Sequence, residues 1–335
     1  MSEIEGVLRR IRAITDPALR AEVDRLGDPT MRHIARYQMG WVDAEGAPSD
    51  AGGKAIRPAF TVLAAQAVGA EPESALPAAV AVDLVHNFSL LHDDVMDRDV
   101  SRRHRPTGWV VFGTGQAILA GNAMLTVAFD ALTRTGNEHC LPTLFSSVQA
   151  LISGQSQDLA LEERDGVTLD EVITMEAGKT AALLSCATAL GAEIARAPRE
   201  SITALAAFGH DVGIAFQLVD DILGINGDPA RTGKSASSDV RAGKRSAPIV
   251  AALNGTSSAS ARLAEMLAGG PPKTDEDVEL ATSLIGEAGG LEWASREADS
   301  RLTSALSHLD TLGADGAPAV TELAELARYV VDRDR

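Results

Sequence analysis

The chain has 335 residues, is 45% hydrophobic and carries a formal net charge of -17, with a pI of about 4.8. This acidic balance excludes a nucleic-acid surface built on a basic stripe and a polybasic contact with anionic lipid. Only 4% of the residues are aromatic, and the helix formers alanine and leucine fill most apolar positions. These features predict an all-α protein in one compact domain.

The cysteine content and the N-terminal segment bear on the compartment. Cys140 and Cys186 fit no metal-ligand spacing and no disulfide framework, which is typical of thiols in a reducing compartment such as the cytoplasm. The N-terminal segment is charged throughout and lacks the apolar core of a signal peptide. No run of about 18 consecutive apolar residues occurs, so we expect no transmembrane span.

The predicted elements begin with a helix over residues 3 to about 41, where apolar residues recur at helical spacing. A loop rich in glycine, proline and aspartate follows at 43–53. Lys54 and Arg57 come next, at the entrance of a helix that Pro58 can begin. Two cations at this end oppose the helix dipole, so they are either solvated loop charges or ligands of an anion.

The next predicted helix, about 74–92, ends in an acidic cluster. Asp93 and Asp97 are four residues apart, so on a helix they share a face and repel each other, and Asp94 adds a third charge. All-oxygen ligation suits Mg²⁺, which commonly bridges one or two carboxylates to phosphate oxygens. Cations that could hold such a phosphate follow at Arg102, Arg103 and Arg105. The alternative is a solvated helix end of mixed charge.

A further helix is predicted over 115–133, and residues 138–164 follow it. Capping residues then open another segment at Thr168. That segment contains Lys179 and Thr180 among small apolar residues. A lysine in this setting either reaches the surface along its aliphatic stem or projects into a cavity as a cation.

A long helix over 198–225 carries a second acidic pair. Gln217, Asp220, Asp221 and Gly224 fall at i, i+3, i+4 and i+7, so they share one face. The surroundings are apolar, and paired acids in such a setting need a charge partner. The alternative is an ordinary acid pair near a helix end.

A basic loop follows the long helix. It contains Lys234 and Lys244 among glycine and serine, so it could close over a phosphate or serve only as a solvated linker. Residues 249–335 are predicted to form further helices with a packing role. No zinc spacing and no serine or cysteine catalytic arrangement stands out, and the AGKT segment at 177–180 lacks the upstream glycine and strand of a nucleotide loop.

Two oxygen-rich candidate metal sites with neighbouring cations in an apolar helical bundle favour one chemistry. That chemistry is the ionisation of an apolar diphosphate. Metal and cations would neutralise the leaving diphosphate, and a dry cavity would shelter the carbocation from water.

Seven segments, in order, resemble the trans-type polyprenyl diphosphate synthases, close to short-chain members of the geranylgeranyl type. They are GGKAIRP at 52–58, HNFSLLHDDVMD at 86–97, RRHRPT at 102–107, GQSQDL at 154–159, KT at 179–180, FQLVDD at 216–221 and GDPARTGKSASSDVRAGK at 227–244. The resemblance implies one polyprenyl synthase domain over 1–335, with its motifs at about 52–248. It also implies an all-α, isoprenoid-synthase-type bundle around a deep central cavity, usually as a homodimer.

The resemblance also implies residue roles. Up to three Mg²⁺ per active site would be held by Asp93, Asp94, Asp97, Asp220 and Asp221. The allylic diphosphate would be bound by Arg102, Lys179, Lys234 and Lys244. Isopentenyl diphosphate would be bound by Lys54, Arg57, His86 and Arg103. The catalytic residues at the reacting centre would be Lys179, Thr180 and Gln217.

Three positions depart from the family pattern. Gly224 replaces the usual third aspartate of the second motif, so the third Mg²⁺ would lose a neighbouring carboxylate while Asp220 remains. His104 stands where glycine is common, and Asn122 stands where the family often has aspartate. Neither of the last two removes a proposed phosphate or metal ligand.

Product length depends on the floor of the cavity. Phe88, five residues before Asp93, matches the bulky residue that blocks elongation in the family, and Ser89 is small. Helical periodicity places Ser89, and not Phe88, on nearly the same side of the helix as Asp93. Periodicity alone therefore does not decide which of the two residues forms the floor. The resemblance favours a C20 product, and farnesyl (C15) and C25 products stay open.

Two rivals remain. A class I terpene cyclase shares the fold and the first motif, but its second metal triad is absent and it would not need Lys54, Arg57 and His86. A non-catalytic partner subunit is favoured by Gly224 and disfavoured by the intact acidic motifs. We therefore expect a Mg²⁺-dependent prenyltransferase that condenses isopentenyl diphosphate head-to-tail with an allylic diphosphate, with no nucleic-acid partner.

Overall fold

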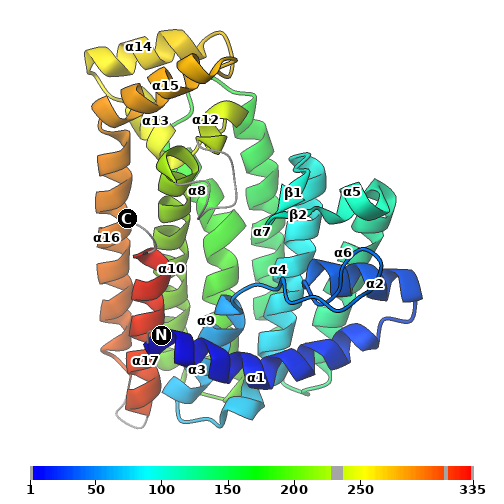
Figure 1. Ribbon diagram of the computed structural model, residues 1–335. Helices are drawn as coiled ribbons and strands as arrows, with labels where there is room; N and C mark the ends of the chain where they lie inside the picture. Colours follow the sequence, from blue (N-terminus) through cyan, green and yellow to red (C-terminus); the bar gives the residue numbers. More distant parts are fainter. Residues whose placement is uncertain (1–2, 228–236, 313–315, 333–335) are drawn as a thin grey trace. The chain divides into compact units, whose positions relative to one another are not determined.

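The computed structural model describes residues 3–227, 237–312 and 316–332 (Figure 1). Within these residues the regular structure is helical apart from β1 (Ser101–Arg102) and β2 (Arg105–Pro106), which pair antiparallel. The expected all-α class is therefore confirmed, with one short hairpin in addition.

The chain divides into two compact units. The first comprises Met1–Val148, Leu183–Gly209 and His308–Leu326. The second comprises Gln149–Ala182, His210–Ser307 and Ala327–Arg335. The expectation of a single polyprenyl synthase domain over 1–335 stays a prediction.

Most helices belong to one unit. Those of the first unit are α1 (Glu3–Asp24), α2 (Pro29–Gln38), α3 (Ile56–Ala67), η1 (Pro72–Ala75), α4 (Leu76–Met96), α5 (Gly108–Phe112) and α6 (Thr114–Thr133). Those of the second are α8 (Leu169–Glu176), η2 (Ala177–Ala181), α12 (Ser238–Ala242), α13 (Ala247–Leu253), α14 (Ser258–Leu267) and α15 (Asp275–Glu287). Helices with residues in both are α7 (Cys140–Glu162), α9 (Ala182–Ile194), α10 (Arg199–Asn226), α16 (Gly290–Leu309) and α17 (Ala317–Val331).

The N-terminal segment differs from its prediction. A single helix over 3–41 was wrong, because α1 ends at Asp24 and α2 begins at Pro29. The Asp28 carboxylate accepts hydrogen bonds from the backbone N–H groups of Thr30 and Met31, at 2.8 and 3.0 Å, and so caps α2. Pro29 at the first helical position needs no intrahelical N–H partner and has the backbone φ of a helix start, so it marks the beginning of a separate helix.

Helices α4 and α6 pack closely and carry much of the first unit's core (Figure 1). Gly121 of α6 is required here, because a Cβ at that position would lie 2.3 Å from His92 Nε2 of α4. Leu91 of α4 is fully buried with Ala117 and Ala120 of α6. The burial of such apolar side chains contributes most of the favourable free energy of folding.

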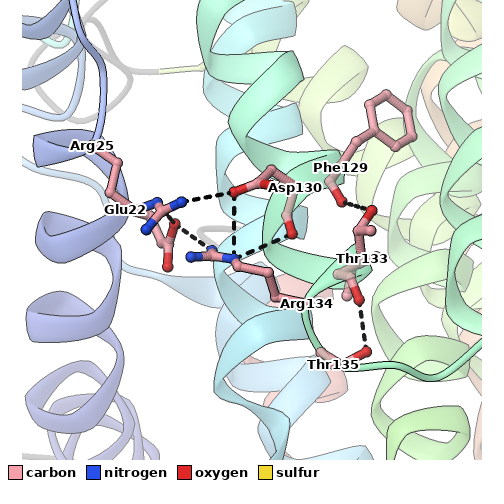
Figure 2. A network of polar contacts seen from close by, with 8 residues as sticks. Glu22, Arg25, Phe129, Asp130, Thr133, Arg134 and Thr135 are labelled. Carbon is pink, nitrogen blue, oxygen red and sulfur yellow. Dashed lines mark hydrogen bonds and ion pairs between the residues drawn. The ribbon is translucent and has the colours of Figure 1, made fainter.

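A polar network ties α1 to the C-terminal end of α6 (Figure 2). Arg134 donates to Glu22 Oε2 at 2.6 Å, and Arg25 donates to Asp130 Oδ2 at 3.2 Å. Both arginines are largely exposed to solvent. Such surface pairs contribute about 0–1 kcal/mol each, so the network orients α1 more than it stabilises the unit.

The second unit has a separate apolar cluster that anchors the end of α10. Ile225 of α10 is buried with Val240 of α12 and Ile249 of α13, together with apolar residues of α14 and α15. The C-terminal helices α13 to α15 therefore pack, as predicted, and they fix the last turn of the helix that carries the second acidic motif.

Three apolar helical stretches are long enough to cross a membrane by length and composition: Pro72–Met96, Thr114–Thr133 and Arg199–Asn226. Of their most apolar windows, 67%, 39% and 56% respectively are buried within the fold. Most of the first and third windows is therefore buried within the protein, and the window in α6 is the least buried of the three.

Candidate active site

The first acidic motif lies in the last turn of α4, which continues to Met96, one turn beyond its predicted end. Asp93 and Asp97 are partly exposed there, and the Asp97 N–H donates to the Asp93 carbonyl at 2.8 Å. Carboxylates at the C-terminal end of a helix face the negative end of its dipole. A bound cation would offset this penalty, so the position suits a metal.

Asp94 differs from its neighbours because it points into the protein. It is only 1% exposed, and Arg102 Nε and Nη2 both lie 2.6 Å from Asp94 Oδ1. Burial raises the pKa of Asp94 above its ordinary value, and the charge of Arg102 opposes that rise. The second carboxylate oxygen is buried without a hydrogen-bond partner. The Asp94–Arg102 ion pair fixes the buried side of the first acidic motif. Direct metal ligation by Asp94 stays a prediction.

The β1–β2 hairpin positions the arginines that follow the motif. Ser101 pairs with Pro106 and Arg102 with Arg105, which leaves a two-residue turn at Arg103 and His104. Both turn residues have positive φ, 52° and 60°. This is the backbone of a turn that favours glycine or asparagine, so His104, which departs from the family glycine, occupies a strained position.

Three of the four residues predicted to bind isopentenyl diphosphate form one electrostatic cluster in the first unit. Arg57 Nη1 lies 3.1 Å from His86 Nε2. Burial lowers the pKa of His86 well below its ordinary value, and the charges of Arg57, Arg103 and Arg102 lower it further. Gly53 approaches the Arg103 guanidinium so closely that a Cβ would lie 3.0 Å from Nη2. The imidazole is therefore a neutral acceptor within a cationic cluster.

Asp83 is a member of this cluster that the sequence analysis missed. Burial raises the pKa of Asp83 to about 6, and the charges of Arg57 and Arg103 oppose that shift. Asp83 stands three residues before His86, so helical spacing placed it on the same face of α4. Its single carboxylate balances part of the positive charge.

A small cavity lies beside the Asp94–Arg102 pair. Its volume is about 30 Å³, room for about one water molecule. Tyr37 and Arg105 are among its lining residues; the Tyr37 hydroxyl donates to the Pro106 carbonyl at 2.6 Å and Arg105 lies 4.1 Å above the Tyr37 ring. Neither role was predicted, because both partners come from segments distant in sequence.

The two candidate chain-length residues are buried in α4. Phe88 is 5% exposed, and its ring meets the His92 ring edge-on at 4.7 Å. The Ser89 hydroxyl donates to the His86 carbonyl at 2.8 Å, back along its own helix. Of the two, Phe88 is the bulky group.

In the second unit, Lys179 and Thr180 lie in η2, a π-helical turn between α8 and α9. π-Helical turns inside helices are frequent at functional sites. The helix cap expected at Thr168 is present and is a capping box: Glu171 N donates to Thr168 Oγ1, and Thr168 N donates to Glu171 Oε2. The turn also brings the Lys179 ammonium into an ion pair with Asp158 of the GQSQDL segment.

Gly154 explains why that segment begins with glycine. A Cβ on Gly154 would lie 2.2 Å from the backbone nitrogen of Lys179. Gly178 approaches α7 in the same way, since its Cβ would lie 2.8 Å from the Ala150 carbonyl oxygen. Only a backbone without side chains at both positions permits this close contact between α7 and η2.

Thr180, Gln217 and Asp221 form a hydrogen-bonded chain. The Thr180 hydroxyl donates to Gln217 Oε1 at 2.6 Å, and Gln217 Nε2 donates to Asp221 Oδ1 at 2.7 Å. The Ala247 N–H donates to Asp221 Oδ2 at 3.0 Å. Asp221 is thus buried and occupied by protein donors, whereas the neighbouring Asp220 is exposed. Of the second acidic pair, Asp220 is the one open to a ligand.

Glu176 was not predicted. It is 2% exposed, with neither carboxyl oxygen hydrogen-bonded. Burial, and next the charge of Asp221, raise the pKa of Glu176 well above its ordinary value, while burial and then the charge of Asp239 raise the pKa of Asp221 to about 7. Of this pair, Glu176 is the neutral acid. No local pattern marked it, because a glutamate one turn before Lys179 is an ordinary helix residue.

The carboxylates of the two acidic motifs fit the predicted Mg²⁺. No three histidine, cysteine, aspartate or glutamate side chains form a ready-made metal cage in the described part of the chain. Mg²⁺ does not need such a cage, because it keeps several waters and binds through one or two carboxylates plus phosphate oxygens. Asp93, Asp97 and Asp220 offer accessible oxygen donors of that kind, so the residues fit the ion. Lys234, expected to bind the allylic diphosphate, lies outside the described residues.

An all-α fold with acidic and cationic groups at its helix ends defines a helical enzyme of the isoprenoid-synthase type. The family model for polyprenyl synthetase matches residues 47–285, and the chain belongs to this family. It is therefore a trans-type prenyltransferase, as the sequence predicted.

Individual relatives agree with this assignment. The chain is 45% identical to a (2E,6E)-farnesyl diphosphate synthase of Mycobacterium tuberculosis over 98% of this chain and 92% of that protein. It is 43% identical to a geranylgeranyl diphosphate synthase of the same organism over 91% and 88%. A crystal structure of a polyprenyl synthetase from Streptomyces coelicolor superposes with a TM-score of 0.92 at 44% identity, covering 98% of this chain and all of that one.

Proposed function

We propose that the protein condenses isopentenyl diphosphate with an allylic diphosphate in a Mg²⁺-dependent reaction and releases geranylgeranyl diphosphate. The observation that carries the proposal is the cluster of Arg57, His86 and Arg103 beside the acidic end of α4. A cationic cluster with a neutral imidazole suits a diphosphate anion, since its guanidinium groups offer fork-shaped donors. Lys54, next to the same helix entrance, completes this predicted set.

The acidic ends of the helices would hold the metal. In the first unit Asp93 and Asp97 are the proposed Mg²⁺ ligands, with Asp94 fixed behind them by Arg102. In the second unit Asp220 is the proposed ligand, with Asp221 fixed behind it by protein donors. When bound, Mg²⁺ supplies positive charge that stabilises the leaving diphosphate. Arg102, Lys179 and Lys244 are the cations proposed for the same anion, with Lys234 as the fourth.

Thr180 and Gln217 have a positioning task that their hydrogen bond supports. The Thr180 hydroxyl donates to the Gln217 side chain, so the amide orientation is set and its oxygen is oriented toward the hydroxyl. Oriented dipoles of this kind stabilise a developing cation without reorganisation. No side chain is assigned as base, because the released diphosphate can take the final proton.

Product length is the finer part of the proposal. Buried Phe88 supports a cavity that stops at C20, since one bulky residue stands five positions before Asp93. A C15 product is the second candidate, and it rests on the 45% identity to the farnesyl diphosphate synthase. A C25 product, the terpene cyclase and the non-catalytic subunit stay open as weaker alternatives.

The assembly proposed is a cytoplasmic homodimer without a transmembrane span. Ile118 and Leu119 of α6 and Phe145 of α7 are exposed, and Phe129 stacks on Phe145 with ring centroids 4.4 Å apart. Exposed apolar residues on a protein of net charge -17 suit a second copy of the same chain, because like charges elsewhere keep copies apart. Light scattering on a Phe145→Asp variant should show a monomer where the wild type is a dimer.

One assay tests the proposed reaction. The purified protein is incubated with labelled isopentenyl diphosphate, Mg²⁺ and C5, C10 or C15 allylic primers, and the products are dephosphorylated and separated by chain length. We expect C20 alcohol from each primer and no product when chelator replaces Mg²⁺. A product formed from an allylic diphosphate without isopentenyl diphosphate would indicate a cyclase, and no turnover with any primer would favour a partner subunit.

A further inference from the structure

The sequence makes Arg105 a candidate phosphate ligand, but its guanidinium is bound to the protein backbone. Arg105 Nη2 donates to the Val42 carbonyl at 2.7 Å, and Nη1 donates to the Tyr37 carbonyl at 3.4 Å. The same group lies 4.1 Å from the centre of the Tyr37 ring, over its face. A planar fork with a flat face can make all three contacts at once, and a lysine ammonium cannot. Arg105 therefore joins β2 to α2 and to the loop that follows α2.

Tyr37 makes the reciprocal contact from α2. Its hydroxyl donates to the Pro106 carbonyl at 2.6 Å, so each of the two side chains holds the backbone of the other's segment. Tyr37 is 5% exposed, and its ring meets the Phe112 ring of α5 edge-on with centroids 5.2 Å apart. The tyrosine ring cannot turn away from the hairpin without breaking this packing. We call the reciprocal contact the Tyr37–Arg105 clamp.

The clamp acts on a hairpin whose turn is strained. Arg103 and His104 are consecutive residues with a Cβ, and both adopt positive φ, 52° and 60°. Such conformations persist only where the surrounding structure fixes them, and they concentrate at functional sites. At the base of the hairpin, the Thr107 N–H donates to the Val100 carbonyl at 3.1 Å and its hydroxyl to the Asp99 carbonyl at 2.7 Å. The clamp fixes the strand that leaves the turn.

The strained turn brings Arg103 to the predicted isopentenyl diphosphate site. The Arg103 guanidinium lies so close to Gly53 that a Cβ there would be 3.0 Å from Nη2. Its charge also contributes to the lowered pKa of His86 in the same cationic cluster. Tyr37, Arg105 and Arg103 line one small cavity. The clamp therefore adjoins the arginine whose backbone it helps to hold.

We propose that Tyr37 and Arg105 are positioning residues for isopentenyl diphosphate, which hold the β1–β2 hairpin so that Arg103 presents its guanidinium to the diphosphate. Arg105 does not itself bind phosphate. The inference rests on the proposed function and adds two residues to one of its sites. Arg102, predicted to bind the allylic diphosphate, has a separate anchor in Asp94 at 2.6 Å. Loss of the clamp should therefore raise the KM for isopentenyl diphosphate more than the KM for the allylic primer.

Steady-state kinetics with each substrate varied in turn provide the test. Arg105→Lys keeps the charge and loses the fork, Arg105→Gln loses both, and Tyr37→Phe loses only the hydroxyl. We expect the KM for isopentenyl diphosphate to rise about tenfold in both Arg105 variants and about threefold in Tyr37→Phe. The kcat and the KM for the allylic primer should stay within about twofold of the wild type, a split that a loss of stability alone would not give.

Arg32→Lys is the matched control. Arg32 also lies in α2 and donates through Nε and Nη2 to a backbone carbonyl, that of Leu26, at 3.0 and 2.6 Å, but Leu26 precedes α2 and is no part of the hairpin. This variant should keep both wild-type KM values. The double variant Tyr37→Phe with Arg105→Lys should raise the KM for isopentenyl diphosphate no further than Arg105→Lys alone, because both changes break one clamp.

The outcomes separate this inference from the proposed function. A wild-type KM in Arg105→Lys, with a rise only in Arg105→Gln, would show that Arg105 acts through its charge and would overturn the inference. An equal rise in both KM values, or a fall in kcat of the same size, would overturn it as general damage to the fold. A wild type that incorporates no isopentenyl diphosphate with any primer overturns the proposed reaction, and the inference with it. If Arg105→Lys does not fold, the two KM values of Tyr37→Phe decide.

Discussion

Arg57 Nη1 lies 3.1 Å from His86 Nε2. A guanidinium group can only donate, so the imidazole nitrogen that it meets must be an unprotonated acceptor. Burial of the ring, followed by the charges of Arg57, Arg103 and Arg102, holds the pKa of His86 well below its ordinary value. The cluster is therefore stable only while His86 is neutral, which makes it sensitive to acid.

The first prediction concerns that sensitivity. Because the folded-state pKa of His86 is lowered from 6.5, the unfolded chain binds an extra proton in acid. The contribution of neutral His86 to the free energy of unfolding is present above about pH 6.5 and is lost as the pH falls below that value. Urea unfolding of the wild type and of His86→Gln, measured from neutral pH to about pH 5, should show the wild type losing stability relative to the variant.

Asp83 has the opposite dependence on pH, because its pKa is raised to about 6. The contribution of protonated Asp83 to the free energy of unfolding is lost as the pH rises through that value. Asp83 is present in both proteins, so the difference between their curves isolates His86. Parallel curves across the range would show that the imidazole does not carry the acid sensitivity.

The second prediction concerns the Asp94–Arg102 pair. Arg102→Ala leaves a carboxylate that is 1% exposed without its ion partner. Removing one partner of a buried pair costs about 3–5 kcal/mol, and the lower end applies here because Arg102 is partly exposed. The free energy of unfolding from urea titration should fall by about 3 kcal/mol. Asp94→Asn in the Arg102→Ala background should recover part of the loss; no recovery would mean that the arginine stabilises by packing alone.

The third prediction concerns the hairpin turn. His104 adopts φ 60°, a left-handed conformation that costs a residue with a Cβ about 1 kcal/mol relative to glycine. His104→Gly should therefore raise the free energy of unfolding by about 0.5–1 kcal/mol. Ser101→Gly in the adjoining strand is the matched control: its φ is not positive, so it should lose stability. A loss in both variants would show that the His104 side chain makes a compensating contact.

The sequence predicted those features of the site that depend on local spacing. The shared face of Asp93 and Asp97, the cap at Thr168 and the neighbouring positions of Gln217 and Asp221 all follow from helical periodicity. The structure then joined Thr180 to Gln217, and Arg57 to His86, over separations of 37 and 29 residues. Periodicity alone cannot assign such pairs; the family resemblance placed them in common sites.

Other features were not predictable because tertiary neighbours determine them. The spacing of Asp94 makes it look like Asp93, yet its partner Arg102 turns it inward. Gly224 looks like a simple loss of a carboxylate, yet the Asp239 side chain occupies the space that a side chain at position 224 would need. The break between α1 and α2 is different, since Asp28 followed by proline is a helix-start signal within the sequence itself. Apolar periodicity on both sides of the break outweighed that signal.

The fourth prediction concerns Gly154 and the π-helical turn. Gly154→Ala would place a Cβ 2.2 Å from the Lys179 nitrogen, so α7 and η2 must separate. We expect a lower unfolding temperature and at least a tenfold loss of prenyltransferase activity, because displacement of a charged group by about an ångström is enough for such a loss. Gly115→Ala, where a Cβ meets open space, is the control and should be stable and active. Equal behaviour of the two variants would show that the close approach is not needed.

The last prediction concerns the product. Phe88 is buried and braced edge-on against His92, which itself lies against Gly121 of α6, so the ring has little freedom to move aside. Phe88→Ala should lengthen the product beyond that of the wild type, because removal of the ring opens space for a further C5 unit of about 5 Å, more than three residues of helix rise.

The stability cost of Phe88→Ala is about 3–5 kcal/mol, so Phe88→Leu is the companion variant that keeps most of the packing. Ser89→Ala is the matched control on the same helix, since the Ser89 hydroxyl donates to the His86 carbonyl and the change removes a single oxygen. Chain lengths from a C15 primer, determined by mass spectrometry of the dephosphorylated alcohols, should shift in the Phe88 variants and not in Ser89→Ala. An unchanged product from folded Phe88→Ala and Phe88→Leu would place the floor of the cavity on another residue, and a shift in Ser89→Ala alone would assign it to the face that helical periodicity favours.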